Sequence, residues 1–446
     1  MSGDDASLVV HRSSFIIQPM LLLDLLYLSA LGVASPYCAY KLLTQRKIRA
    51  GLKEKLGFVP PRQDQRPCVW FHCVSVGEVG LARELIRRFE QRFPAIEPVI
   101  STGTDTGRSA AEKSFPGHTI FYYPFDFSPC VGKTLRAIRP QAIVLMEWEL
   151  WPNLILMARR AGVPVIIVNG RITENNFRRL SRVRFLVEPL LNSLHTIAVQ
   201  DTDYARRITA LGADPAKVVL TGNMKYDTVK TSIPPDHPAY AAIRSLHAHP
   251  LLVGGCTWAG EEEALLRIYA DLKRSCPGLG LVLAPKHAER LAEVRRLIER
   301  AGFAHAELSS LKLHTISDEN NRIPPDCVIL VDTFGELDAV YAAADIVFVG
   351  RSLTQHGGQN MLEPAALGKP VIFGPYTENF KEAAELLLAA RAAIRVNSEA
   401  ELHRQVAEFI DNPDPFLQAG AEGRKVIEAK KGTTERNIGL LEHIIA

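Results

Sequence analysis

From Cys68 onward the chain alternates short apolar runs with longer helical stretches, and this alternation constrains its fold more than any other feature. The runs are rich in Val and Ile and predict strands at 68–73, 97–101, 119–123, 142–146, 164–168, 196–199, 251–254, 281–284, 328–331, 346–349 and 371–373. In the first half, helices are predicted at 79–93, 153–161, 177–194 and 201–211. This pattern is typical of doubly wound parallel sheets covered by helices on both faces, so we expect an α/β fold.

The length of 446 residues exceeds what one hydrophobic core supports, which predicts two domains. The rhythm restarts near Val218, and the Pro-containing stretch 228–238 is a candidate linker region. The predicted division is an N-terminal segment 1–45, a first Rossmann-like domain 46–217, a second Rossmann-like domain 218–430, and a C-terminal helix 431–446 that packs back on the first domain. Such sheets bind ligands at the carboxyl ends of their strands, and we expect these two edges to face each other across a cleft.

The N-terminal segment carries a nearly continuous apolar run at 20–37, interrupted by Asp24. Its length is near the lower limit for a bilayer span, and a cluster of Lys and Arg follows at 41–55. We predict a membrane-anchor helix with the domains on the cytoplasmic face. Spanning and interfacial placement stay open, and a buried amphipathic helix is the alternative. Asp4 and Asp5 argue against a secretory signal peptide.

Composition excludes several classes of function. A formal net charge of +3, without clustered basic and aromatic residues, predicts no nucleic-acid partner. The seven Cys are scattered without metal-ligand spacing, which predicts no metal site and a reducing compartment. A P-loop motif is missing, and the dinucleotide fingerprint is missing after the first strand.

Acidic residues follow two predicted strands of the first half. Glu78 lies at a helix N-terminus, where a carboxylate can act as a general base or only complement the helix dipole. The dipole lowers the pKa of such a base and partial burial raises it, so both interpretations stay open. Glu147 and Glu149 stand at the carboxyl end of strand 142–146, where these sheets bind ligands. The alternative is that this segment only connects two elements and that Trp151 packs in the hydrophobic core.

In the second half, the stretch 351–375 joins a Gly-rich loop, a helix start and a strand, and it directly follows the strand 346–349. Its candidate ligand-binding residues are His356, Gly357, Gly358, Asn360 and Glu363. Loops at 254–263, 285–287 and 334–336 also follow strands, and Lys225 can neutralise a phosphate. Together they predict a nucleotide site at one edge of the second sheet.

Several motifs resemble those of the 3-deoxy-D-manno-octulosonic acid (Kdo) transferases of Gram-negative lipopolysaccharide synthesis. They are SVGE at 75–78, ELWPN at 149–153, NGRIT at 169–173, GNMKYD at 222–227, PKH at 285–287, FGEL at 334–337 and HGGQNMLEPAALGKPVIFGP at 356–375. The resemblance covers nearly the whole chain. It implies the two-domain GT-B glycosyltransferase fold and inverting transfer of Kdo from the donor CMP-Kdo to lipid A precursor at the inner membrane, with no other cofactor and no metal.

The resemblance also implies roles for individual residues. Glu78 would be the catalytic base, and Glu147 and Lys225 would stabilise the transition state. The donor nucleotide would be held by Pro285, Lys286, Phe334, Gly335, Glu336, Asn360, Met361, Leu362 and Glu363. The chain departs from the family pattern at four positions, where Lys286 replaces Arg, Trp258 replaces His, Trp148 replaces a small polar residue and Gly170 replaces Ala.

Two other classes of function are compatible with the residues. One is a different GT-B enzyme, such as a UDP-sugar lipid transferase or a nucleotide-sugar epimerase, which nucleotide preference would distinguish. The other is a non-catalytic membrane adaptor that kept the fold. The presence of Glu78, Glu147 and Lys225 together argues against the adaptor.

Overall fold

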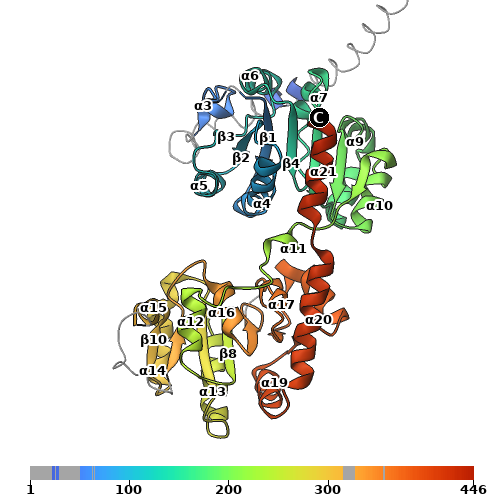
Figure 1. Ribbon diagram of the computed structural model, residues 1–446. Helices are drawn as coiled ribbons and strands as arrows, with labels where there is room; N and C mark the ends of the chain where they lie inside the picture. Colours follow the sequence, from blue (N-terminus) through green and yellow to red (C-terminus); the bar gives the residue numbers. More distant parts are fainter. Residues whose placement is uncertain are drawn as a thin grey trace, which may run out of the picture. The chain divides into compact units, whose positions relative to one another are not determined.

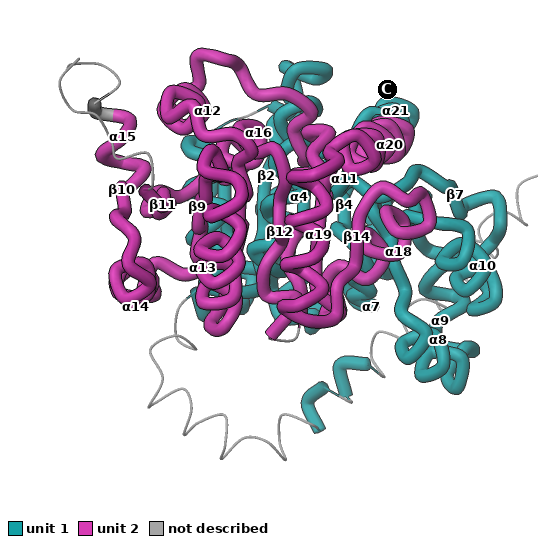
Figure 2. Tube along the Cα trace, turned by 90° about the horizontal axis from the view of Figure 1, so that it is seen from below, with its two compact units in different colours: residues 1–228, 432–446 teal, residues 229–431 magenta. Residues whose placement is uncertain are grey.

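The computed structural model describes residues 23–25, 27–29, 51–62, 64, 66–314, 327–354 and 357–445. The chain divides into two compact units, of which unit 1 contains Met1–Thr228 and Gly432–Ala446, and unit 2 contains Val229–Lys431 (Figure 2). Each unit is built on one parallel sheet, as the alternation of strands and helices predicts.

The sheet of unit 1 has 7 strands in the order β3-β2-β1-β4-β5-β6-β7, with every neighbouring pair parallel. The strands are β1 (Cys68–Cys73), β2 (Glu97–Thr102), β3 (Ile120–Tyr122), β4 (Ala142–Met146), β5 (Val165–Gly170), β6 (Thr196–Val199) and β7 (Val218–Leu220). The α-helices are α3 (Leu52–Lys55), α4 (Val76–Arg92), α5 (Asp105–Ser114), α6 (Ser128–Ile138), α7 (Pro152–Arg160), α8 (Glu174–Ser181), α9 (Arg184–Leu191), α10 (Thr202–Ala210), α11 (Lys225–Thr228) and α21 (Thr433–Ile445). The strand order reverses between β1 and β4, the point at which open sheets bind ligands.

Helices cover both faces of this sheet because its central strands are apolar on both sides. On one face, Trp70 of β1 and Ile143 of β4 belong to a core cluster with Leu154 of α7. On the other face, Phe71 of β1 shares a cluster with α4 and with Leu441 of α21 (Figure 1). Burying each such side chain contributes about 1.5–3 kcal/mol, so the C-terminal helix is an integral layer of unit 1.

The sheet of unit 2 also has 7 strands, in the order β10-β11-β9-β8-β12-β13-β14, and all its neighbouring pairs are parallel. The strands are β8 (Leu251–Thr257), β9 (Gly280–Pro285), β10 (His305–Glu307), β11 (Val328–Leu330), β12 (Ile346–Val349), β13 (Val371–Phe373) and β14 (Ile394–Arg395). The α-helices are α12 (Pro238–Arg244), α13 (Glu261–Leu272), α14 (Leu291–Arg300), α15 (Leu308–His314), α16 (Leu337–Ala343), α17 (Leu362–Ala366), α18 (Lys381–Ala389), α19 (Glu399–Asp411) and α20 (Asp414–Lys430). Here the order reverses between β8 and β12.

The predicted boundary between the domains at 217/218 is wrong. Strand β7 pairs in parallel with β6 and closes the sheet of unit 1, so the first unit runs on to Thr228. A restart of the strand–helix alternation predicts a further strand, but it does not predict which sheet that strand joins. The helix predicted at 177–194 is two helices, α8 and α9, because Val183 leaves the helical conformation with φ −121° and ψ 28°.

The predicted anchor at 20–37 lies mostly outside the described residues. Within the described part of the chain, no helix is both long and apolar enough to cross a bilayer, so the anchor helix is not found there. Asp24 is 7% exposed, and its carboxylate accepts hydrogen bonds from the Ser128 N–H and from Nδ2 of Asn153, each at 3.0 Å. It thereby caps α6, whose N-cap residue makes no side-chain capping bond. Asp24, the acid that interrupts the apolar run, therefore contacts the sheet-containing part of unit 1.

Candidate active site

Glu78 lies in the first turn of α4, directly after β1, and is 8% exposed. Its Oε2 accepts a hydrogen bond from the Val74 N–H at 2.7 Å, and its Oε1 accepts one from the Ser75 hydroxyl at 3.0 Å. Ser75 Oγ in turn accepts from the Glu78 N–H at 3.4 Å and so caps α4. Glu78 therefore does stabilise the helix N-terminus, as the structural alternative proposes.

The pKa of Glu78 decides whether capping excludes a role as a base. Burial raises this pKa by more than the hydrogen bonds from Val74 and Ser75 lower it, and the negative charge of Glu147 raises it further. A carboxylate with a raised pKa accepts a proton more readily than a surface carboxylate does. Capping and base catalysis are thus compatible at this position.

Glu147 and Arg171 form an ion pair where β4 and β5 end. The Glu147 N–H donates to the Val168 carbonyl at 2.9 Å, which carries the pairing of the two strands up to this residue. Glu147 itself has φ 55°, a left-handed conformation that is uncommon for residues with a side chain. Its Oε2 lies 3.1 Å from Nε of Arg171. Backbone strain of this kind clusters at functional sites, and here it lies at the switch point of the sheet.

Glu149 joins Glu78 and Glu147 in a cluster of three carboxylates. Burial raises the pKa of Glu149 to about 7, with further contributions from the charges of Glu78 and Glu147. A carboxyl group with this pKa is partly protonated at neutral pH, so Glu149 can carry a proton there. The sequence analysis noted the position of Glu149 after strand 142–146, beside Glu147, but gave Glu149 no role.

Lys225 begins the short helix α11, and its backbone N–H donates to Oδ1 of Asn223 at 3.0 Å. This helix packs against α4, which carries Glu78, and against α21. Among the described residues no partner is found for the Lys225 ammonium. The structure therefore places Lys225 in unit 1, on an element that contacts the helix of Glu78.

A buried polar cluster beneath this edge was missed by the sequence analysis. Ser101 Oγ lies 2.9 Å from Nδ1 of His72 and accepts a hydrogen bond from Trp70 Nε1 at 2.7 Å. Burial lowers the pKa of His72 to about 3, so its imidazole is neutral. The ring centroids of His72 and Tyr123 lie 4.1 Å apart, and those of Tyr123 and Trp151 lie 4.6 Å apart. These side chains are far apart in the sequence, and no local pattern predicts that they meet.

Asp126 is a second buried acid that sequence reasoning did not find. Its two carboxylate oxygens accept hydrogen bonds from the Asn153 and Leu154 N–H groups at 3.0 and 2.9 Å, which caps α7. Burial raises its pKa to about 7 despite these bonds. Asp126 thus holds the helix that follows Glu149.

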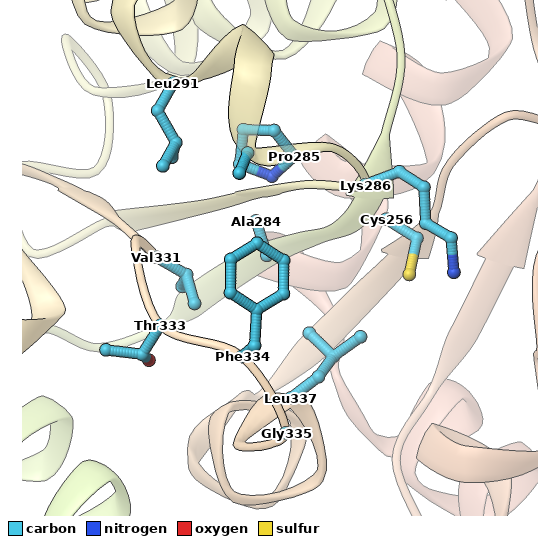
Figure 3. Close-up of a pocket in the computed structure, with 11 residues that line it drawn as sticks. Cys256, Ala284, Pro285, Lys286, Leu291, Val331, Thr333, Phe334, Gly335 and Leu337 are labelled. Carbon is cyan, nitrogen blue, oxygen red and sulfur yellow. The ribbon is translucent and has the colours of Figure 1, made fainter. Parts of the chain in front are cut away.

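In unit 2, a cavity of about 180 Å³ opens at the carboxyl edge of the sheet (Figure 3). Four residues of the predicted donor site line it, namely Pro285, Lys286, Phe334 and Gly335. Figure 3 shows the Phe334 ring among the other lining side chains, and this ring is 70% exposed. An exposed aromatic ring beside a cavity can stack on a flat heterocycle, and Lys286 supplies a cation nearby.

Glu336 does not line this cavity, although it is adjacent to Gly335. Its Oε2 lies 2.7 Å from Nζ of Lys312. Burial raises the pKa of Glu336, but hydrogen bonds from Lys312 and Thr333 outweigh burial and leave the pKa lowered. The residue is therefore an ionised carboxylate that holds the loop next to the cavity.

The loop at 357–363 has the backbone that the sequence analysis predicted. Gly357 and Gly358 both adopt positive φ, at 124° and 69°, whereas His356 lies outside the described residues. Asn360 donates from Nδ2 to Oε1 of Glu363 at 3.0 Å and accepts at Oδ1 from the Leu362 N–H at 3.2 Å. Burial raises the pKa of Glu363 and outweighs the lowering by Asn360 and Lys286, so this pKa lies above its ordinary value.

Met361 and Leu362 differ from the other predicted donor residues, because their side chains are 0% and 3% exposed. They pack in the core of unit 2, so only their backbone groups can reach a ligand. Among the other predicted donor residues, Phe334 supplies an exposed aromatic ring, and polar or charged side chains come from Lys286, Glu336, Asn360 and Glu363. The short α17 begins at Leu362.

Sequence comparisons with known proteins give matches to one enzyme family. A family model described as 3-deoxy-D-manno-octulosonic-acid transferase matches residues 50–228. The chain is 31% identical over 440 residues to the 3-deoxy-D-manno-octulosonic acid transferase of Haemophilus influenzae, with 96% of both chains covered. It is 30% identical over 390 residues to the enzyme of the same name from Bordetella pertussis, covering 84% of this chain and 86% of that one.

Among solved structures, the UDP-GlcNAc 2-epimerase from Neisseria meningitidis matches with a TM-score of 0.53 over 81% of this chain and 99% of that chain. Its sequence is only 14% identical, so the likeness concerns the fold alone. Two parallel-sheet α/β units are consistent with the GT-B architecture. With a relative 31% identical across nearly its whole length, the chain belongs to the 3-deoxy-D-manno-octulosonic acid transferase family of glycosyltransferases.

Proposed function

We propose that this enzyme transfers Kdo from CMP-Kdo to lipid A precursor with inversion at the anomeric carbon, as a step of lipopolysaccharide synthesis. The single observation that carries the proposal is the carboxylate of Glu78 at the switch point of unit 1, with a raised pKa and two fixed hydrogen-bond donors. Membership in a family of Kdo transferases supports the sugar. CMP as the nucleotide and lipid A precursor as the acceptor rest on the motif resemblance.

In the proposed reaction an acceptor hydroxyl attacks the anomeric carbon of Kdo. A new carbon–oxygen bond forms there while the bond to the phosphate of CMP breaks, and the bonding electrons leave with CMP. Glu78 takes the hydroxyl proton, a contribution of typically about 10²–10⁴-fold to the rate. Because its backbone and hydroxyl donors fix the carboxylate, little reorganisation is needed at the moment of transfer.

Two further charged residues of unit 1, Lys225 and Glu147, would stabilise the transition state. Lys225 offers an ammonium group without a partner among the described residues, suited to the negative charge that grows on the leaving phosphate. Glu147, paired with Arg171, would stabilise the positive character of the anomeric carbon. Transfer requires this edge and the donor edge of unit 2 to act on the same substrate pair.

For the donor, we propose that the cytosine ring stacks on Phe334 in the cavity of unit 2 while Lys286 neutralises the phosphate. The exposure of Phe334 and the cation at the cavity wall support this placement. Gly357 and Gly358 have no side chains, so the backbone of this loop lets the phosphate or the sugar approach closely. Cations would do the work of a metal ion, so the proposal needs none.

We further propose that the N-terminal segment and its basic flank hold the enzyme on the cytoplasmic face of the inner membrane. The apolar run at 20–37 and the Lys and Arg residues that follow support this localisation. The acyl chains of a lipid A precursor stay in the bilayer, so an enzyme that acts on its sugar must work at the membrane surface.

The test is incubation of the full chain with CMP-Kdo and lipid A precursor, followed by mass analysis of the lipid product. A mass increase of one or more Kdo residues is expected, together with release of CMP. Thermal protection by CMP but not by UDP is expected in parallel. Protection by UDP alone, or an unmodified lipid at full enzyme concentration, would refute the assignment.

A further inference from the structure

Trp258, His287 and Arg351 come from three loops that meet at one edge of unit 2. They follow β8, β9 and β12, which are neighbours in the sheet, and the strand order reverses between β8 and β12. Trp258 and Arg351 therefore stand on either side of the switch point. None of the three belongs to the donor residues that the motif resemblance implies.

The carboxylate of Glu261 fixes the backbone of both switch-point residues. Its Oε2 accepts hydrogen bonds from the Trp258 N–H at 2.9 Å and from the Arg351 N–H at 2.7 Å. Its Oε1 accepts from the Ser352 and Leu353 N–H groups, both at 2.9 Å. Glu261 is 0% exposed, so these are the bonds of a buried, fully used carboxylate. One side chain thus sets the positions of the β8 loop and the β12 loop relative to each other.

This frame holds the guanidinium of Arg351 against an aromatic face. Cζ of Arg351 lies 5.1 Å from the ring centroid of Trp258, within the range of a cation–π contact. The Trp258 ring is itself supported edge-on by His287, with centroids 5.0 Å apart. A guanidinium stacked on a ring keeps its in-plane N–H donors free for another ligand.

The guanidinium also lies beside the Gly-rich loop. A side chain added at Gly357 would come within 3.5 Å of Nε of Arg351, and Gly358 donates its N–H to the Arg351 carbonyl at 2.8 Å. Arg351 is partly exposed, and its guanidinium forms no ion pair with any residue that the structure describes. The result is a fixed, partly exposed cation next to a glycine backbone that a ligand can approach closely.

We propose that Arg351, stacked on Trp258, binds the carboxylate of the transferred sugar acid. This inference rests on the proposed function, because it takes the donor to be a nucleotide-activated sugar acid. Such a donor carries two anionic groups, the phosphate and the sugar carboxylate. Lys286 at the cavity is a compact charge suited to the phosphate, whereas a planar guanidinium matches a carboxylate with two parallel hydrogen bonds.

The backbone of Arg351 provides an unusually clean variant. Its φ is 52°, a left-handed conformation that glycine adopts without strain. Arg351→Gly therefore removes the guanidinium without straining the loop. Arg391 is an exposed arginine of the same unit with φ 54°, so Arg391→Gly is the matched control for the change in backbone freedom.

The experiment is calorimetric titration of wild type, R351G and R391G with CMP and with CMP-Kdo. R351G is expected to leave the affinity for CMP unchanged and to weaken CMP-Kdo by about 10- to 100-fold, the loss of a charge-assisted hydrogen-bond pair. R391G is expected to match wild type with both ligands. An equal loss of both ligands in R351G would show that Arg351 only shapes the loop, and unchanged affinity for CMP-Kdo would exclude the contact.

A donor whose carboxylate is converted to the amide completes the cycle. Wild type is expected to bind the amide more weakly than CMP-Kdo, whereas R351G is expected to bind the two about equally. An identical penalty for the amide in both proteins would overturn the proposal. Wild type that binds neither CMP nor CMP-Kdo would refute the proposed function itself, and the sugar-acid subsite with it.

Discussion

The two sheet edges carry opposite chemistry on the same architecture. In unit 1, the switch point gathers the carboxylates of Glu78, Glu147 and Glu149, and the charge of Glu147 raises the pKa of the other two. In unit 2, the corresponding edge carries the cations Arg351, which is stacked on Trp258, and Lys286, which lines the cavity with the exposed Phe334 ring. The parallel sheet supplies a place for ligands, and the loops decide which ligands.

Under the proposed function, this difference gives each unit one half of the transfer reaction. An alcohol has to lose a proton, which suits an acidic cluster with raised pKa values. An anionic nucleotide has to be held as it leaves, which suits cations. Substitutions on either edge test this division of roles.

Replacing the central acid of unit 1 is expected to have the largest effect. Glu78→Gln removes the proton acceptor but keeps an oxygen for the Val74 or Ser75 donor, so the helix cap survives in part. We expect kcat to fall by about 10²–10⁴-fold, with CMP affinity unchanged. Steady-state kinetics and calorimetry measure the two quantities. Turnover close to wild type would remove Glu78 from the mechanism.

On the donor side, the aromatic residue of the cavity is expected to matter next. Phe334→Ala removes a ring that is 70% exposed, and the loss of base stacking weakens CMP binding by about 5- to 100-fold. Phe185 is similarly exposed at 73% but belongs to unit 1, so Phe185→Ala is the matched control and is expected to bind CMP normally. Equal CMP affinity in both variants would contradict stacking at Phe334.

The coupling of the three carboxylates predicts a shift in pH dependence. Glu147→Gln removes a negative charge that raises the pKa of both Glu78 and Glu149. Both groups then lose their protons at lower pH, so the acidic limb of kcat/KM moves to lower pH even as the rate falls. The exposed Glu112→Gln on α5 is the control and should leave the profile in place. A limb that does not move would show that the acids titrate independently.

The last prediction concerns the free energy of unfolding, to which the buried helix cap Asp126 makes a pH-dependent contribution. The pKa of Asp126 is about 7 in the folded protein and 3.8 ordinarily, so the folded state holds an extra proton between these values. Its contribution to the free energy of unfolding therefore falls as pH rises from 4 to 7, by at most about 1.4 kcal/mol per unit. Asp126→Asn lacks this titration, and its stability relative to wild type should improve over that window. Denaturant unfolding at pH 5 and pH 7 measures the difference, which would be constant if Asp126 stayed ionised.

Sequence reasoning predicted those parts of the fold that depend on short stretches of neighbouring residues. Strands such as β4 and β13 were predicted at their observed bounds, because a strand buried on both faces is a continuous apolar run. The positive φ of Gly357 and Gly358 followed in the same way from residue type. Four of the residues that the motif resemblance assigns to the donor site line one cavity, although the motifs contain no information on the sheet order.

What sequence reasoning missed depends on contacts between distant residues. Asp24 reaches Asn153 across 129 positions, and the Glu261 carboxylate reaches Arg351 across 90. Both acids look like ordinary residues of their own segments. The membership of β7 in the first sheet has the same origin, since a short strand pairs wherever a free edge is available.

The return of α21 to unit 1 has a consequence for synthesis on the ribosome. Ile438 and Leu441 complete a core that includes Phe71 and the buried face of α4. Unit 2 ends at Lys431, so all its residues are made before these two side chains exist. During synthesis, one apolar face of the amino-terminal half of unit 1 stays uncovered until α21 has been made. The usual order, in which the first domain made is the first to finish folding, is reversed in this chain.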